Sequence, residues 1–142
     1  MIEAREHLTE MEFESGDYLF KQGDSTGFLF LINKGEVEVY LDTPEGGRVT
    51  LAILGEGQVV GEFAIVDYKP RSASARALTP VDGIKVSAEG YQGLLEGLPE
   101  WAMAVIETLV DRLRKADEMI AQSELEDPEV QARKESILAA TK

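Results

Sequence analysis

The residues of this chain whose types and spacing could do chemistry lie between positions 61 and 74. Gly61 has no Cβ, so a ligand and the backbone could approach closely there, and the Glu62 carboxylate could accept a hydrogen bond from a hydroxyl group. Arg71 carries a planar guanidinium that fits two phosphate oxygens better than an ammonium group does. The candidate ligand-binding residues are Gly61, Glu62, Phe63, Ala64, Arg71, Ser72, Ala73 and Ser74. This segment, which we call the cassette, is equipped to hold a phosphorylated sugar.

The local charge of the cassette opposes that of the whole chain. The chain has a formal net charge of -13, yet Lys69, Arg71 and Arg76 lie in the stretch 68–81, which has no acidic residue. A short helical turn over residues 63–66 would add free backbone N–H groups near a phosphate. Taken singly, each cassette residue also fits a purely structural place in a turn or a loop. Their fixed order favours a ligand site over that alternative.

Composition excludes several classes of function. A length of 142 residues fits one domain, and the acidic balance argues against general binding to nucleic acid or anionic lipid. The chain has no cysteine and a single histidine, His7, so neither a thiolate site nor a histidine-rich metal site can be built. No segment approaches the roughly 20 apolar residues of a membrane span. We therefore expect a cytoplasmic binding protein with no catalytic residue, no metal or cofactor, and no membrane insertion.

Short apolar segments between turn residues must position the cassette. They recur about every 8 to 12 residues through the first part of the chain, which is typical of an antiparallel sandwich or barrel. Val37, Val39 and Leu41 alternate as in a half-buried strand. The predicted strands are residues 18–21, 28–32, 37–41, 49–54, 73–78 and 84–86. The sequence therefore predicts a mainly β fold, a compact β-roll, followed by a helix.

That helix is predicted from an apolar stripe that begins after Pro99. The stripe residues, spaced by fours and threes, are Ala102, Ile106, Leu109, Leu113, Ala116 and Ile120. The stripe could pack on the β-roll or pair with a second subunit, and we expect a homodimer through it. Beyond residue 122 the chain is polar and acidic and Pro128 interrupts it. We therefore divide the chain into a domain over residues 1–122 and an acidic tail or linker over residues 123–142.

Several motifs are shared with a known family. They are Val60-Gly61-Glu62-Phe63-Ala64-Ile65, Pro70-Arg71-Ser72-Ala73-Ser74, Gly16-Asp17-Tyr18-Leu19-Phe20, Gln22-Gly23-Asp24, Gly35-Glu36-Val37-Glu38-Val39 and Leu54-Gly55-Glu56-Gly57. Over roughly residues 10–120 the chain closely resembles the cyclic nucleotide-binding domain family, the module of catabolite activator proteins and of cyclic-nucleotide-dependent kinases and cyclic-nucleotide-gated channels. The resemblance implies a jelly-roll β-sandwich with a short helix in the cassette and a C-terminal helix that closes over the base as a lid. Movement of that lid would be the signal.

The resemblance also implies individual contacts. Glu62 would bind the ribose 2′-hydroxyl and Arg71 the exocyclic oxygens of the cyclic phosphate. The remaining sugar and phosphate contacts would come from Gly61, Phe63, Ala64, Ser72 and Ala73. Ala116 and Asp117 would lie near the base, where Asp117 could accept from adenine or guanine N–H groups or be a solvated helix carboxylate.

The base itself is less clearly encoded. The hydroxyl of Ser72 could reach the amino group of a syn guanine, but cAMP-binding catabolite activators resemble the Arg71-Ser72-Ala73 pattern too. We expect cAMP, with cGMP as the alternative, and the effector is unknown. The short acidic end of the chain has no second helical pair with a basic face, so DNA binding is not expected. The competing hypothesis is a structural or dimerisation domain that retains the fold without a ligand.

Overall fold

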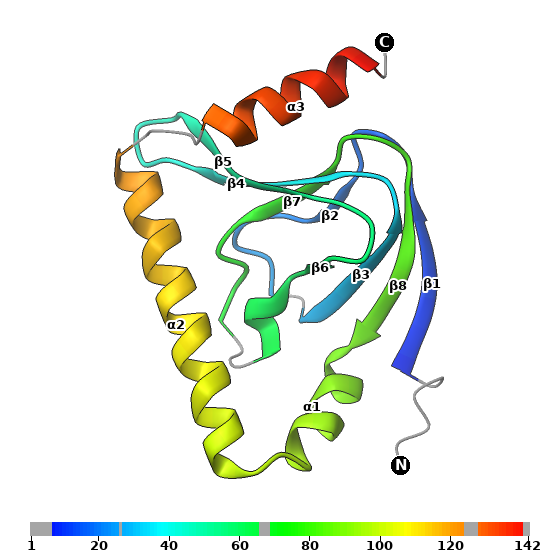
Figure 1. Cartoon of the computed structure of the whole chain (residues 1–142), viewed down its shortest axis with the longest axis vertical. Helices are drawn as coiled ribbons and strands as arrows, with labels where there is room; N and C mark the ends of the chain where they lie inside the picture. Colours follow the sequence, from blue (N-terminus) through cyan, green and yellow to red (C-terminus); the bar gives the residue numbers. More distant parts are fainter. Residues whose placement is uncertain (1–6, 26, 66–68, 124–127, 141–142) are drawn as a thin grey trace.

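Two four-stranded antiparallel sheets pack face to face (Figure 1). The computed structural model describes residues 7–25, 27–65, 69–123 and 128–140. One sheet has the order β1 (Leu8–Phe13), β8 (Val81–Ser87), β3 (Phe28–Lys34), β6 (Val59–Val60), and the other has the order β2 (Tyr18–Phe20), β7 (Ser74–Ala77), β4 (Val37–Asp42), β5 (Arg48–Leu54). The helices are the 3-10 helix η2 (Glu62–Ile65), α1 (Ala88–Glu96), α2 (Glu100–Ser123) and α3 (Pro128–Ala140). The predicted mainly β jelly-roll sandwich, with a short cassette helix and a long C-terminal helix, is confirmed.

The core lies between the two sheets and is built from strand residues that point inward. Phe30 and Ile32 of β3 are fully buried, and the ring of Phe30 meets that of Phe13 edge to face, with centroids 5.5 Å apart. Between β3 and β4 the chain turns at Gly35, whose φ is +100° and whose missing Cβ would lie 2.3 Å from the carbonyl oxygen of Pro80. Only glycine fits this turn, because a side chain would meet both backbone strain and a backbone atom.

All six predicted strands form, with ends that differ by a few residues, and two strands were not predicted. β1 pairs with β8 from Leu8 opposite Val86 to Phe13 opposite Val81, although half of its residues are polar. β6 consists of two residues beside β3. The predicted alternation in β4 is only partly right, because a register shift follows Val39 and the polar Glu38 is as fully buried as Val37.

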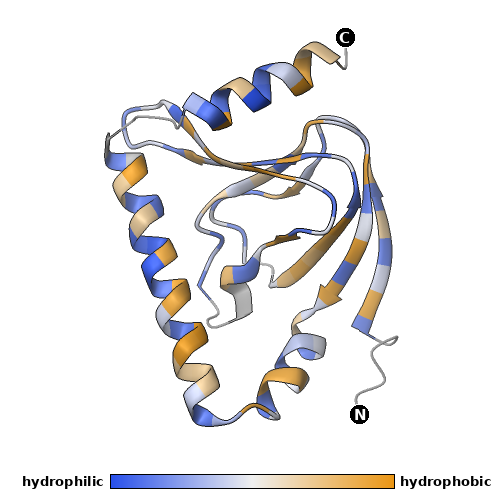
Figure 2. Ribbon diagram, viewed as in Figure 1, coloured by the Kyte–Doolittle hydropathy of each residue, from blue (hydrophilic) through white to orange (hydrophobic). Residues whose placement is uncertain are grey.

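The helical region holds two described helices that the sequence did not predict, α1 and α3. The Ser87 side chain accepts a hydrogen bond of 3.2 Å from the backbone N–H of Gly90 and so caps α1, which ends at Gly97. The long helix α2 then starts directly after Pro99. Hydrophobic segments recur along it (Figure 2). Val110 is buried, whereas Trp101 is 72% exposed and several other apolar residues of the helix are about half exposed. Within the stripe, Ala102, Ile106 and Ile120 are half-buried, whereas Leu109, Leu113 and Ala116 are exposed.

Part of the segment expected as a tail or linker folds into α3. This helix crosses the β4–β5 edge of the second sheet and packs on β5 (Figure 1). No helix among the described residues is long and apolar enough to cross a membrane.

Candidate functional site

Backbone hydrogen bonds hold Arg71 in the segment that leads into β7. Its backbone N–H donates to the carbonyl of Asp24 at 2.8 Å, and its carbonyl accepts from the N–H of Gly23 at 2.8 Å. The loop that joins β2 to β3 therefore fixes the position of this residue before β7 begins. Only 7% of Arg71 is exposed.

The guanidinium of Arg71 lies between aromatic rings and carbonyl groups. Its Cζ lies 3.9 Å from the ring centroid of Phe20 and 4.8 Å from that of Phe28. Nη2 donates to the carbonyl of Phe28 at 2.8 Å, and Nη1 makes a longer contact of 3.4 Å with the carbonyl of Gly61. Among the described residues, the buried Nε of Arg71 has no hydrogen-bond partner. The arrangement leaves one N–H group of a buried cation available to an anion.

Burial acts on the charge of this group without removing it. Desolvation lowers the pKa of the Arg71 guanidinium, and the nearby Tyr91, Asp24 and Glu62 act in the opposite direction. Because an arginine starts from so high a pKa, it remains a cation in this environment. A buried cation gains most from a partner of opposite charge, since water screens the interaction little.

Gly61 makes room for Arg71. Its φ is +87°, and a Cβ at this position would lie 2.7 Å from Nη1 of Arg71 and 2.9 Å from the carbonyl oxygen of Phe28. From the sequence, we expected the absence of a Cβ at Gly61 to leave room for a ligand. In the structure, the guanidinium of Arg71 itself occupies that space. Glu62 follows as the first residue of η2 and is partly buried. The predicted helical turn is thus present one residue early, and its predicted last residue, Val66, lies outside the described residues.

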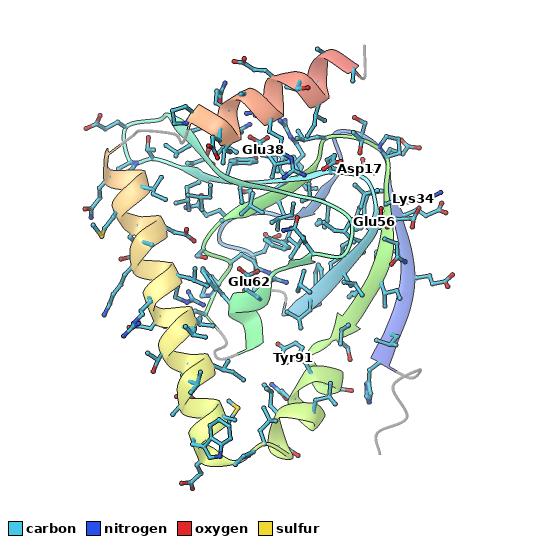
Figure 3. All side chains as sticks on the ribbon, viewed as in Figure 1. Asp17, Lys34, Glu38, Glu56, Glu62 and Tyr91 are labelled. Atoms are coloured by element: carbon cyan, nitrogen blue, oxygen red, sulfur yellow. The ribbon has the colours of Figure 1, made fainter. Side chains whose placement is uncertain are left out.

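These groups line a cavity of about 540 Å³, within the usual size range of small-molecule sites. Glu62, Arg71 and Ser72 are among its polar lining residues, and Val39, Leu51, Ala52 and Leu54 belong to its apolar wall. Figure 3 shows Glu62 on η2 between the sheets and α2, and Tyr91 pointing from α1 toward the strands. A cavity that combines a buried cation and a carboxylate with an apolar wall suits an anionic ligand with hydroxyl groups and a flat ring.

The structure brings most of the predicted cassette residues to this cavity. Phe63 and Ala73 line it together with the polar residues named above, and Ala64 lies in η2 with a side chain outside the description. Ser74 is not among the lining residues. It is 3% exposed in β7, and its hydroxyl accepts a hydrogen bond of 2.9 Å from the backbone N–H of Gln22. Its observed contact therefore joins β7 to the end of β2.

The helix α2 closes one side of the cavity. Leu113, Arg114 and Asp117 line it, and the guanidinium of Arg114 lies 4.7 Å from the ring centroid of Phe63. Ala116, the other residue predicted near a base, is exposed and is not among the lining residues. Burial, together with the negative charge of Glu62, raises the pKa of Asp117 to about 6, although Arg114 counteracts the shift. Two carboxyl groups therefore share this cavity.

Sequence reasoning missed three parts of the site. Phe20 and Phe28 hold the guanidinium of Arg71 from distant positions in the chain, and no local pattern indicates that contact. Tyr91 is 4% exposed and reaches the cavity from α1, a helix that was not predicted. Arg114 could have been found, because it precedes Asp117 by one helical turn and so shares its face.

Comparison with known proteins gives one consistent result. Residues 10–97 match the family model of the cyclic nucleotide-binding domain. The cyclic AMP receptor protein of Thermus thermophilus is 35% identical over 105 residues, which cover 74% of this chain and 49% of that protein. A cAMP-dependent protein kinase regulatory subunit of Emericella nidulans is 35% identical over 88 residues, 62% of this chain and 21% of that protein. The chain thus spans about half the length of these relatives or less.

Solved structures agree with this result. The EAL enzyme Bd1971 in its cAMP-bound form is 30% identical and has a TM-score of 0.73, with 81% of this chain and 30% of that chain covered. Its cGMP-bound form is 31% identical and has a TM-score of 0.69, with 75% and 28% covered.

Proposed function

Because the chain belongs to the cyclic nucleotide-binding domain family, we propose that it is a sensor that captures a cyclic nucleotide and passes occupancy on through α2. The observation that carries this proposal is the buried guanidinium of Arg71, whose Nε has no partner among the described residues, in a cavity that also holds Glu62. A cyclic phosphate would supply the missing anion, and the ribose 2′-hydroxyl would donate to the carboxylate.

The proposed contacts follow from the positions of the lining residues. Arg71 pairs with the exocyclic phosphate oxygens, and Ser72 and Ala73 complete the phosphate shell from the same loop. Glu62 takes the 2′-hydroxyl, with Gly61, Phe63 and Ala64 supplying backbone groups around the sugar. No role in ligand binding is proposed for Ser74, because its hydroxyl is buried against Gln22.

For the base we propose adenine, with guanine as the alternative. Asp117 lies on the cavity wall formed by α2 and can accept a hydrogen bond from either purine when ionised. Similarity to a cyclic AMP receptor protein and to a cAMP-dependent kinase subunit supports cAMP. Both a cAMP-bound and a cGMP-bound form of Bd1971 resemble this chain, so fold similarity alone does not separate the two ligands.

The signal would be a change in the position of α2. Leu113, Arg114 and Asp117 place this helix directly on the cavity, so a ligand that contacts them favours one helix position over others. The exposed apolar residues of α2, among them Trp101 and Leu109, would pair with a second copy in a homodimer. In this proposal residues 1–122 form the sensing domain and residues 123–142 an extension that carries α3.

Composition and net charge also bear on what the chain does not do. We propose a cytoplasmic, non-enzymatic module without DNA binding of its own, since it has no cysteine, one histidine and a net charge of -13. The competing hypothesis remains a ligand-free structural or dimerisation domain. The cavity favours the sensor, because it brings the buried guanidinium of Arg71 and the carboxylate of Glu62 to one open space that a structural domain would not need.

Calorimetric titration with cAMP and cGMP side by side tests the function. Removing a buried charge partner typically costs about 2 to 5 kcal/mol, so Arg71→Ala should weaken binding by roughly 30- to 3000-fold. Arg48→Ala is the control, because Arg48 is an exposed arginine that stacks on Tyr40 and does not line the cavity. No binding of either nucleotide at millimolar concentration would favour the structural domain instead. Equal affinities of the Arg71→Ala variant and the wild-type chain would refute the assigned site.

A further inference from the structure

Helix α3 is held on the sheet by charged side chains more than by apolar ones. None of its described residues is buried, and Leu138 is 36% exposed. Val130 and Ile137 are half-buried on the face that carries Lys134, but this is much less than the buried apolar stripe by which surface helices usually dock. Arg133 contacts the Ile53 carbonyl and the Glu36 carboxylate, both at 3.2 Å, and Lys134 contacts Thr50 at 3.3 Å and Glu38 at 2.6 Å.

Glu38 is the centre of this contact. It is a carboxylate with no exposed surface, and it lies directly under α3 in Figure 3. The hydroxyl of Thr50 donates to it at 2.5 Å, and Arg76 of β7 pairs with its other oxygen at 3.1 Å. Burial alone would raise the pKa of Glu38, but Lys134, Thr50 and Arg76 together hold the pKa below its ordinary value. The carboxylate is therefore kept ionised by one cation from the sheet and one from α3.

The two ion pairs of α3 are not equivalent. The side chains of Arg133 and Glu36 are 51% and 31% exposed, so water screens their attraction. The side chain of Lys134 is 19% exposed and its partner is fully buried. Loss of Lys134 would leave the buried Glu38 carboxylate with Arg76 as its remaining described cation, which is more costly than losing an exposed pair. Lys134 is thus the contact on which docking of α3 depends most.

Docking of α3 also restricts α2. Only residues 124–127 separate the two helices, and a chain extends by at most about 3.6 Å per residue. While α3 stays on the sheet, the end of α2 cannot travel far from it. In the present structure α3 is docked and α2 lies on the cavity through Leu113 and Asp117. The docked position of α3 and the position of α2 on the cavity are therefore compatible with each other.

We propose that α3 is a detachable latch for α2, in which the ion pair between Lys134 and the buried Glu38 clamps the end of the chain to β4 and β5. Release of this pair frees α3 as a unit while the sandwich stays folded. The latch favours the position of α2 on the cavity, so ligand binding and α3 docking strengthen each other by linkage. This coupling rests on the proposed function, whereas the clamp itself does not.

Hydrogen exchange on the full chain tests the clamp. Lys134→Met keeps most of the length of the side chain and removes its charge, and amides of residues 128–140 should then exchange at least tenfold faster while β4 and β5 stay protected. Lys134→Arg keeps a cation and should retain most of the protection. The control Lys115→Met removes a lysine that is 70% exposed and pairs with Asp111, and it should leave α3 unchanged.

Three outcomes of that experiment overturn the clamp. Unchanged exchange of residues 128–140 in Lys134→Met would show that the pair does not hold α3. Equal loss of protection in the arginine variant would show that charge is not the cause. Loss of protection throughout β4 and β5 would make α3 an integral part of the fold instead of a detachable latch.

A titration with cAMP tests the coupling. Lys134→Met, although remote from the cavity lining, should bind cAMP at least threefold more weakly, and cAMP should slow the exchange of residues 128–140 in the wild-type chain. Unchanged affinity in a variant whose α3 is released would overturn the coupling but keep the clamp. If the wild-type chain binds neither cAMP nor cGMP, the proposed function and the coupling both fail, and the exchange experiment still decides the clamp.

Discussion

Replacing Gly61 by alanine should weaken cyclic nucleotide binding without removing a charge or a hydrogen-bonding group from the cavity. The added Cβ would lie 2.7 Å from Nη1 of Arg71, and ordinary contact begins at 3.4 Å, so the guanidinium must shift by about 0.7 Å. The backbone cannot relieve the contact cheaply, because the carbonyl oxygen of Phe28 lies 2.9 Å from the same Cβ. The perturbation therefore acts on the position of Arg71.

The size of the effect follows from two separate costs. A left-handed backbone costs a residue with a Cβ about 1 to 2 kcal/mol, and this lowers stability. A displaced guanidinium loses hydrogen bonds to a charged group, worth about 1.5 to 3 kcal/mol each, and this lowers affinity by roughly 10- to 100-fold. Stability and affinity should thus both fall, for different reasons.

Gly57 supplies the matched control. Its φ is +81°, close to that of Gly61, but a Cβ there would meet nothing within 4 Å. Gly57→Ala should show the same loss of stability in urea unfolding and an unchanged affinity for cAMP in calorimetry. If Gly61→Ala binds cAMP as well as Gly57→Ala does, the guanidinium is not the group that holds the ligand.

Three further predictions concern other parts of the molecule. Burial and the charge of Glu62 raise the pKa of Asp117 to about 6. The folded chain therefore binds a proton on the Asp117 carboxyl group more tightly than the unfolded chain does, and its stability falls as the pH rises from about 4 to 6. Asp117→Asn should therefore be about 2 kcal/mol more stable than wild type in urea at pH 8, with no gain at about pH 4. Burial raises the pKa of Glu38, but its hydrogen bonds and neighbouring cations lower that pKa by more. The contribution of Glu38 to folding stability is therefore present above the ordinary pKa of 4.5 and is lost as the pH falls through the pKa of the folded state. Glu38→Gln should cost about 3 kcal/mol in urea at pH 7 and approach wild type in acid, and a constant difference across pH would contradict this assignment. Leu109→Glu on the exposed face of α2 should convert a dimer into a monomer in light scattering, and a wild-type chain that is monomeric at high concentration would exclude that dimer.

Much of the fold could be predicted because turn residues and apolar segments mark most strands locally. The missed elements lack such marks. β6 has only two residues, and α1 is separated from α2 by a break at Gly97 that a search for one long helix passes over. α3 docks through charge, which leaves no apolar period in the sequence, and its anchor Glu38 looks like the solvent-facing member of an alternating strand.

The cassette could be predicted because its chemistry is concentrated in one short segment. Its geometry could not, since Phe20 and Phe28 lie far from Arg71 in the chain and meet it only in the folded sandwich. Residues that are neighbours in sequence can also point to different places in the fold. Ser74 is close in sequence to the loop residues of the cavity but belongs to β7, where successive side chains point to opposite faces. Helical geometry separates Asp117 from Ala116 in the same way.

The most direct test of the site is a crystal structure of the chain with cAMP. We expect an exocyclic phosphate oxygen within about 3 Å of the Nε of Arg71, the ribose 2′-hydroxyl on the carboxylate of Glu62, and the base against α2. A nucleotide whose phosphate lies away from Arg71, or one bound outside this cavity, would contradict the assignment.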